Sequence, residues 1–215
     1  KKKPQAAGPI PALLLTCEHG GNKVPARYRH LFRGEEDVLE THRGWDPGAL
    51  DLAKWLARWL DAPLHFSQVS RLLVEMNRSP NSRNLFSRFS QPLPPEEKER
   101  LLDEYYWPYR RAVEEEIRAA LGRDRRVVHV SVHSFSPSID GEERRADVGL
   151  LYDPSRSLER DFAGVWQKQF SAGFVVRRNY PYLGIADGHT RWLRPKFPGD
   201  QYAGIELEVN QKHWK

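Results

Sequence analysis

The chain has 215 residues, of which 39% are hydrophobic and 11% aromatic. This composition is sufficient for one folded core and excludes a mainly disordered chain. The sequence contains no run of the roughly 18 apolar residues that a membrane-spanning helix needs. The net charge of +5 suits nucleic acid or an acidic small substrate, but the aromatic residues fall mainly at helical core spacing, which disfavours nucleic acid. A single cysteine excludes an intrachain disulfide and is typical of a reducing cytoplasm, so we expect a cytoplasmic protein with no nucleic-acid or membrane partner.

Strand and helix patterns alternate along the chain. A continuous apolar run at residues 12–16 predicts a buried strand, and Asp46 followed by proline predicts a helix with an aspartate N-cap. A long helix is expected from Pro95, kinked at Pro108 and ended by Gly122. Further strands are predicted at residues 63–66, 71–76, 127–133, 147–152, 173–177 and 202–209, and a further helix at 157–170.

This alternation predicts an α/β fold of three layers, in which helices cover a mixed, mostly parallel sheet. We expect a single domain over residues 1–215, in which residues 1–8 form a flexible tail.

Two histidines stand where predicted strands end. His19 follows the run at 12–16 and His133 ends the strand that begins at Val127; small or turn-forming residues follow each of them. Open α/β sheets place ligand sites at the carboxyl ends of strands, and neutral imidazole is a good zinc ligand. One such histidine could merely hydrogen-bond a loop, but two in matching positions indicate a site. Cys17 is interpreted as a small buried residue rather than as a nucleophile or a ligand.

Two further pairs of residues could carry chemistry. Glu206 and Glu208 share one face of the last predicted strand, and a glutamate beside a metal can act as a general base. An exposed sheet face or a salt bridge to arginine is the alternative. Arg78, beside Asn77, could hold a carboxylate through two parallel hydrogen bonds, or it could form a surface ion pair.

Five segments, in this order, carry a resemblance to a known family. They are CEHGGNKVP (17–25), HRGWDPGA (42–49), SRLLVEMNRS (70–79), VHSFSP (132–137) and GIELEVNQ (204–211), and they span nearly the whole chain. Taken together they resemble the N-formylglutamate amidohydrolase family. That family is similar in fold to zinc carboxypeptidases, so the resemblance implies a fold of that kind here.

The resemblance also implies roles for individual residues. Asn77 and Arg78 look like the pair that grips the substrate carboxylate, with Arg71 as a possible helper. His133 looks like the last metal ligand, and Glu206 falls where the general base lies.

The remaining part of the implied metal site departs from the pattern of zinc carboxypeptidases. Those enzymes carry His-x-x-Glu at the first ligand, whereas the residue three after His19 is Asn22, a poor zinc ligand. We take Asp46 as the replacement carboxylate, although an aspartate before proline is also an ordinary helix N-cap. Glu18 and His42 are the alternatives.

The implied reaction is zinc-dependent hydrolysis of a linear amide. The expected substrate is a small acidic N-acyl amino acid such as N-formylglutamate, with zinc polarising the carbonyl and activating water, and Glu206 moving the proton. Two alternatives stay open: a peptidase or cell-wall amidase of the same fold, and a non-catalytic binding protein that has lost its metal.

Overall fold

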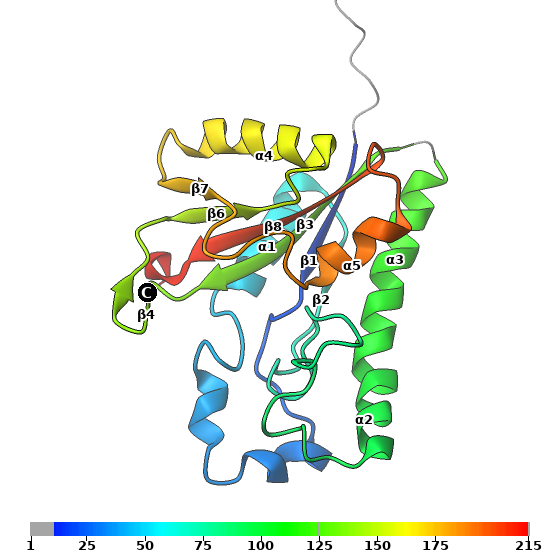
Figure 1. The fold of residues 1–215 in the computed structure, drawn as a ribbon, viewed down its shortest axis with the longest axis vertical. Coiled ribbons are helices and arrows are strands. Elements are labelled where there is room, and N and C mark those ends of the chain that lie inside the picture. The colour runs from blue at the N-terminus through cyan, green and yellow to red at the C-terminus, as the bar shows by residue number, and fades with distance from the viewer. Residues whose placement is uncertain (1–10, 124, 215) are drawn as a thin grey trace, which may run out of the picture.

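The computed structural model describes residues 11–123 and 125–214, so the predicted tail over residues 1–8 lies outside the described part of the chain (Figure 1). Its centre is a six-stranded sheet with the order β2-β1-β3-β8-β6-β7. The strands are β1 (Ala12–Cys17), β2 (Leu64–Phe66), β3 (Val127–Phe135), β6 (Val148–Leu151), β7 (Val176–Arg178) and β8 (Tyr202–Asn210), and a separate hairpin consists of β4 (Ser138–Ile139) and β5 (Glu142–Glu143). Neighbouring strands of the sheet are parallel except β6 and β8, which confirms the predicted mixed, mostly parallel sheet.

Helices cover both faces of this sheet, as predicted (Figure 1). They are α1 (Ala49–Leu60), α2 (Pro95–Leu101), α3 (Trp107–Leu121), α4 (Ser157–Phe170) and α5 (His189–Leu193). Helices α1 and α4 pack on one face, and α3 and α5 pack on the other. A π-helical turn, Leu102–Tyr106, joins α2 to α3 just before Pro108, whose nitrogen cannot donate to the preceding turn, so the predicted kink takes this form.

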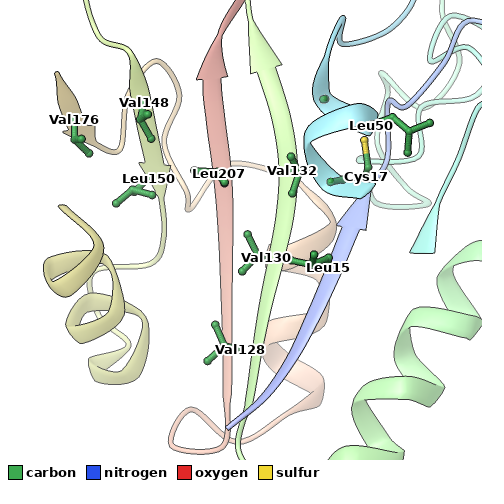
Figure 2. Close-up of a cluster of buried hydrophobic side chains, with 12 residues drawn as sticks. Leu15, Cys17, Leu50, Val128, Val130, Val132, Val148, Leu150, Val176 and Leu207 are labelled. Carbon is green, nitrogen blue, oxygen red and sulfur yellow. The ribbon is translucent and has the colours of Figure 1, made fainter. Parts of the chain in front are cut away.

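The sheet face under α1 and α4 is apolar. Val128, Val130 and Val132 of β3 lie there beside Leu15 and Cys17 of β1 (Figure 2). Cys17 is free and fully buried, which agrees with its interpretation as a small core residue. Burial of each valine or leucine in such a cluster contributes about 1.5–3 kcal/mol.

The opposite face of β3 is polar, although all nine residues of β3 are buried. It carries His129, Ser131 and His133, and helices α3 and α5 close over part of it. Parallel pairing with β8 sets Ser131 beside Glu206 and His133 beside Glu208. The carboxyl ends of the central strands therefore bring histidine and carboxylate side chains to one edge of the sheet.

The strand predicted at residues 71–76 is wrong. This segment forms turns, and the Glu75 N–H donates to the Leu85 carbonyl of a neighbouring loop rather than to a strand. Most of its apolar side chains are buried all the same, because Leu73, Val74 and Met76 pack in two apolar clusters that also include Leu101 and Tyr106. The apolar run indicated burial correctly and secondary structure incorrectly.

The helix predicted to begin at Asp46 begins at Ala49 instead, and no side chain caps it. Gly48 precedes it with a φ of 78°, where a Cβ would collide with the ring of Trp214. The strand predicted at residues 173–177 lies at Val176–Arg178, because Gly173 still belongs to the turn that ends α4. No helix among residues 11–123 and 125–214 is long and apolar enough to cross a membrane.

Candidate active site

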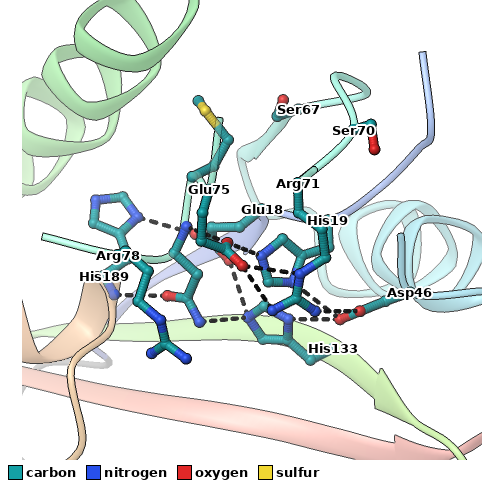
Figure 3. A network of polar contacts seen from close by, with 12 residues as sticks. Glu18, His19, Asp46, Ser67, Ser70, Arg71, Glu75, Arg78, His133 and His189 are labelled. Atoms are coloured by element: carbon teal, nitrogen blue, oxygen red, sulfur yellow. Dashed lines mark hydrogen bonds and ion pairs between the residues drawn. The ribbon is translucent and has the colours of Figure 1, made fainter. Parts of the chain in front are cut away.

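A pocket of about 260 Å³ opens at the carboxyl ends of β1, β3 and β8. The residues that the sequence singled out meet there, and Figure 3 shows most of them. Its lining includes His19, Asp46, Arg71, Asn77, Arg78, His133, Glu206 and Glu208. The topology explains the meeting, because β1, β3 and β8 run parallel and their carboxyl ends therefore lie at one edge of the sheet.

Three of these side chains converge most closely. Asp46 Oδ2 lies 2.8 Å from His133 Nδ1 and 3.3 Å from His19 Nδ1. One ligand atom from each of the three residues fits within 4.8 Å of the other two, and all three residues are buried. Two imidazoles and a carboxylate are a donor set typical of a catalytic zinc site.

Each imidazole is also held from behind by a carboxylate (Figure 3). His19 Nε2 contacts Glu75 Oε1, and His133 Nε2 lies 3.3 Å from Glu18 Oε2. Each ring thus lies between two carboxylates; with a metal ion at the Nδ1 atoms and Asp46, the carboxylates of Glu75 and Glu18 would accept the remaining ring hydrogen at Nε2. Both Nδ1 lone pairs then face the Asp46 carboxylate. Three electron-rich atoms so close together suit a cation between them, so the donor set fits a divalent metal.

Asp46 belongs to this cluster rather than to the helix N-cap. Its backbone N–H donates to the His19 carbonyl at 3.0 Å, which fixes the residue beside that histidine. Burial alone would raise the pKa of the Asp46 carboxyl, but the facing His19 and His133 hold that pKa well below its usual range. Glu18, one of the two alternatives, lies behind the His133 ring, and His42 lines the pocket from an exposed position outside the cluster.

The two arginines differ in how they are engaged. Arg71 is committed to carboxylates of the protein: its guanidinium lies 2.7 Å from Glu75 and 3.2 Å from Asp46. Arg78 lines the pocket and forms no ion pair with a described residue, and its Nη1 donates to the Asp187 carbonyl. Arg78 is therefore the better placed of the two to receive a carboxylate from a substrate.

The Asn77 side-chain amide already makes a hydrogen bond within the protein. Its Oδ1 accepts a hydrogen bond of 2.6 Å from the His189 N–H at the start of α5. This bond orients the amide so that Nδ2 faces the His133 ring, at 3.5 Å from Nε2.

The two glutamates of β8 have different surroundings. Glu206 Oε1 accepts a hydrogen bond of 2.8 Å from Thr190 Oγ1. Glu208 stands beside His133, and its buried Oε2 has no partner among the described residues. Burial raises the pKa of Glu208 to about 7; His133 opposes this shift, while Asp46 and Glu206 add to it.

Sequence reasoning missed Glu75 and His189. The only local signal for Glu75 is an arginine four residues earlier, at Arg71, within an apolar run. His189 begins a five-residue helix in a segment without a strong helical pattern, and it reaches Glu18 through Nδ1 at 3.0 Å. Both contacts join segments far apart in the chain, which a local pattern does not show.

Comparison with known proteins gives the following matches. A model of the N-formylglutamate amidohydrolase family matches residues 11–214. The structure of a gene product of Agrobacterium tumefaciens, Atu2144, is similar over 94% of this chain and 81% of its own, with 30% identity and a TM-score of 0.81. The N-formylglutamate amidohydrolase of Ralstonia eutropha JMP134 shares the fold over 95% of this chain and 83% of its own, with 19% identity and a TM-score of 0.67. No curated protein matches the chain.

Proposed function

Because the chain belongs to the N-formylglutamate amidohydrolase family, we propose that it hydrolyses the amide bond of a small acidic N-acyl amino acid, with N-formylglutamate as the leading substrate, in a site that binds one zinc ion. The observation that carries this proposal is the convergence of His19, Asp46 and His133 in a pocket that also holds Arg78. A volume of about 260 Å³ suits an amino-acid derivative better than a long polymer.

The residues of the pocket divide the work of hydrolysis. His19, Asp46 and His133 would hold the zinc ion, which when bound polarises the amide carbonyl and lowers the pKa of water. Arg78 would bind the substrate carboxylate, with its guanidinium oriented by the Asp187 carbonyl. Arg71 supports the site from behind by neutralising Glu75 and Asp46.

A glutamate of β8 would take the proton from the attacking water. Oxygen from that water joins the acyl carbon, the C–N bond breaks, and the proton passes from the carboxyl group to the leaving amine. The family resemblance implies this role for Glu206, and that assignment remains our prediction. Glu208 is the second candidate, because it stands beside His133 and its Oε2 has no partner, whereas Glu206 is held by Thr190.

The test is release of formate from N-formyl-L-glutamate by zinc-loaded and metal-free protein. We expect turnover only in the loaded protein, with a metal content of about one zinc per chain. Glu206→Gln and Glu208→Gln are compared at equal zinc content, and the variant of the true base should lose roughly 100-fold or more in kcat. If neither variant loses turnover, the mechanism is wrong.

The alternatives give different results in the same assay. Hydrolysis of a peptide or a cell-wall fragment in preference to N-formylglutamate would support a peptidase or amidase. Absence of zinc uptake by the purified protein would support a non-catalytic binding protein and would contradict the proposal.

A further inference from the structure

Glu18 is one of the most deeply buried acids in the described chain. It follows β1 directly, and its side chain has no measurable exposure. Oε1 accepts hydrogen bonds from the Tyr109 hydroxyl at 2.8 Å and from His189 Nδ1 at 3.0 Å. Oε2 accepts from the Ser131 hydroxyl at 2.5 Å and lies 3.3 Å from His133 Nε2. Four donors thus surround the two oxygens, which is the arrangement that an ionised carboxylate needs.

No arginine or lysine of the described residues pairs with Glu18. Glu75, the carboxylate behind the other histidine, differs in this respect because Arg71 neutralises it. The ionisable side chains in direct contact with Glu18 are therefore the imidazoles of His133 and His189 and the Tyr109 hydroxyl. A buried carboxylate without a cationic side chain is costly, so a compensating role is expected.

The geometry around His133 shows what that role can be. Glu18 and the Ser131 hydroxyl lie on the Nε2 side of the ring, while Asp46 lies 2.8 Å from Nδ1 on the other side. With its hydrogen on Nε2, the ring must present the Nδ1 lone pair to the cluster of His19 and Asp46. Glu18 cannot bind the same ion itself, because the imidazole stands between them.

We propose that Glu18 is the positioning residue of the metal site: it fixes the orientation and tautomer of His133 so that Nδ1 is the ligand atom. The inference rests on the proposed function, since it presumes that His133 binds the metal. Glu18 precedes His19 in sequence but contacts His133 instead. This contact is possible because β1 and β3 pair in parallel and set Thr16 beside Ser131. Partners of this kind change metal affinity by roughly 10- to 100-fold.

The experiment measures the zinc dissociation constant by competition with a chromophoric chelator, starting from metal-free protein. Glu18→Gln keeps the size of the side chain but removes the charge and turns one acceptor into a donor, so we expect zinc binding to weaken by roughly 10- to 100-fold. Glu18→Asp keeps the charge, so its zinc dissociation constant should be closer to the native value than that of Glu18→Gln.

Glu159→Gln is the matched control. Glu159 is also a glutamate with no exposure, but it pairs with Arg194 and Arg156 rather than with a histidine. This substitution should lower thermal stability and leave the zinc dissociation constant within about threefold of the native value. Equal weakening in both variants would show that any buried glutamate has the effect, and would overturn the inference.

A second measurement does not depend on a variant that folds. Long-range proton–nitrogen NMR of the zinc-loaded native protein should show the hydrogen of His133 on Nε2 and zinc on Nδ1. Zinc on Nε2 would overturn the inference, as would unchanged zinc affinity in Glu18→Gln. Failure of the native protein to bind zinc would overturn the proposed function as well, so the two failures are distinguishable.

Discussion

The two faces of β3 are equally buried and carry opposite chemistry. One face presents three valines to the apolar cluster under α1 and α4, and the other presents His129, Ser131 and His133 to a network of hydrogen bonds. Alternation in a strand usually means that one face is wet. In β3 it means instead that one face stabilises the fold while the other holds polar groups in place for chemistry.

This difference has a physical cost. Polar atoms on the closed face, which carries His129, Ser131 and His133, need hydrogen-bond partners, since an unpaired buried polar group costs about 1–3 kcal/mol. His129 meets this demand through Thr16 Oγ1 and the Tyr202 hydroxyl, each at 2.8 Å. The substitutions below should separate the two faces, because loss on the apolar face should appear in stability and loss on the polar face in binding.

The largest effect on zinc binding is expected when His133 is substituted, and its neighbour Val132, on the opposite face of β3, provides the contrast. His133→Ala removes a proposed zinc ligand. It should weaken zinc binding by on the order of 1000-fold, because the large free energy of zinc binding comes from only a few protein ligands. Val132→Ala should leave zinc binding unchanged and lower the free energy of unfolding by about 2 kcal/mol, through lost burial and a small cavity. Zinc competition and urea unfolding are measured on both. A loss of zinc affinity in Val132→Ala equal to that in His133→Ala would contradict the division of the strand.

Asp46→Asn tests whether this residue serves the site or the helix. The amide keeps the shape but loses the charge, so zinc should bind more weakly by roughly 100-fold or more. Asp51→Asn, at an exposed acid in the first turn of α1, is the control and should change stability by less than about 1 kcal/mol without affecting zinc. Retention of zinc by Asp46→Asn together with a loss of stability would restore the N-cap interpretation.

The same residue shows where prediction from sequence ends. An aspartate before proline fits an N-cap pattern, and nothing local reveals that its carboxylate turns to two histidines from other segments. Elements with strong local signals were found: α4 has its predicted bounds, Ser157–Phe170, and β3 its predicted start at Val127. The run 71–76 failed because apolar content predicts burial, and a tightly packed loop can bury side chains as well as a strand can.

The site was predictable only in outline. His19 and His133 were expected to meet because both end parallel strands, and the structure brings their rings to a centroid distance of 4.9 Å. The carboxylates behind them were not predicted, since Glu75 lies in the misassigned segment. Glu18 reaches His133 only through the register of β1 against β3, which no local pattern contains.

Arg78→Ala should raise KM for N-formylglutamate by on the order of 100-fold, the scale for losing a charge-assisted pair in a pocket. An amide analogue that lacks the substrate carboxylate should be bound poorly by the native protein and no worse by Arg78→Ala. Arg83→Ala, at an exposed arginine five residues further along the chain, is the control and should change neither value. If replacing the substrate carboxylate by an amide weakens binding by the same factor in the native protein and in Arg78→Ala, Arg78 does not bind the carboxylate.

The smallest effect concerns His129, the member of the polar face furthest from the pocket. Burial lowers its pKa to about 3, the nearby His189 adds to this shift, and Glu18 opposes it. The unfolded chain has an ordinary histidine pKa near 6.5, so between about pH 6.5 and 3 it takes up a proton that the folded protein excludes. Stability should therefore fall as the pH drops through this window, by up to about 2 kcal/mol between pH 6.5 and 5.

His129→Gln keeps a neutral side chain that can bond Thr16 or Tyr202 but cannot gain a proton in this range. Urea unfolding at pH 7.5 and 5.0, with chelator present to exclude metal release, gives the pH-dependent loss for each protein. The native protein should lose up to about 2 kcal/mol more than His129→Gln, while a change from pH 8.5 to 7.5 should affect both alike. Equal losses down to pH 5.0 would mean that the closed face tolerates a charged His129, and that its polar network does not require neutrality there.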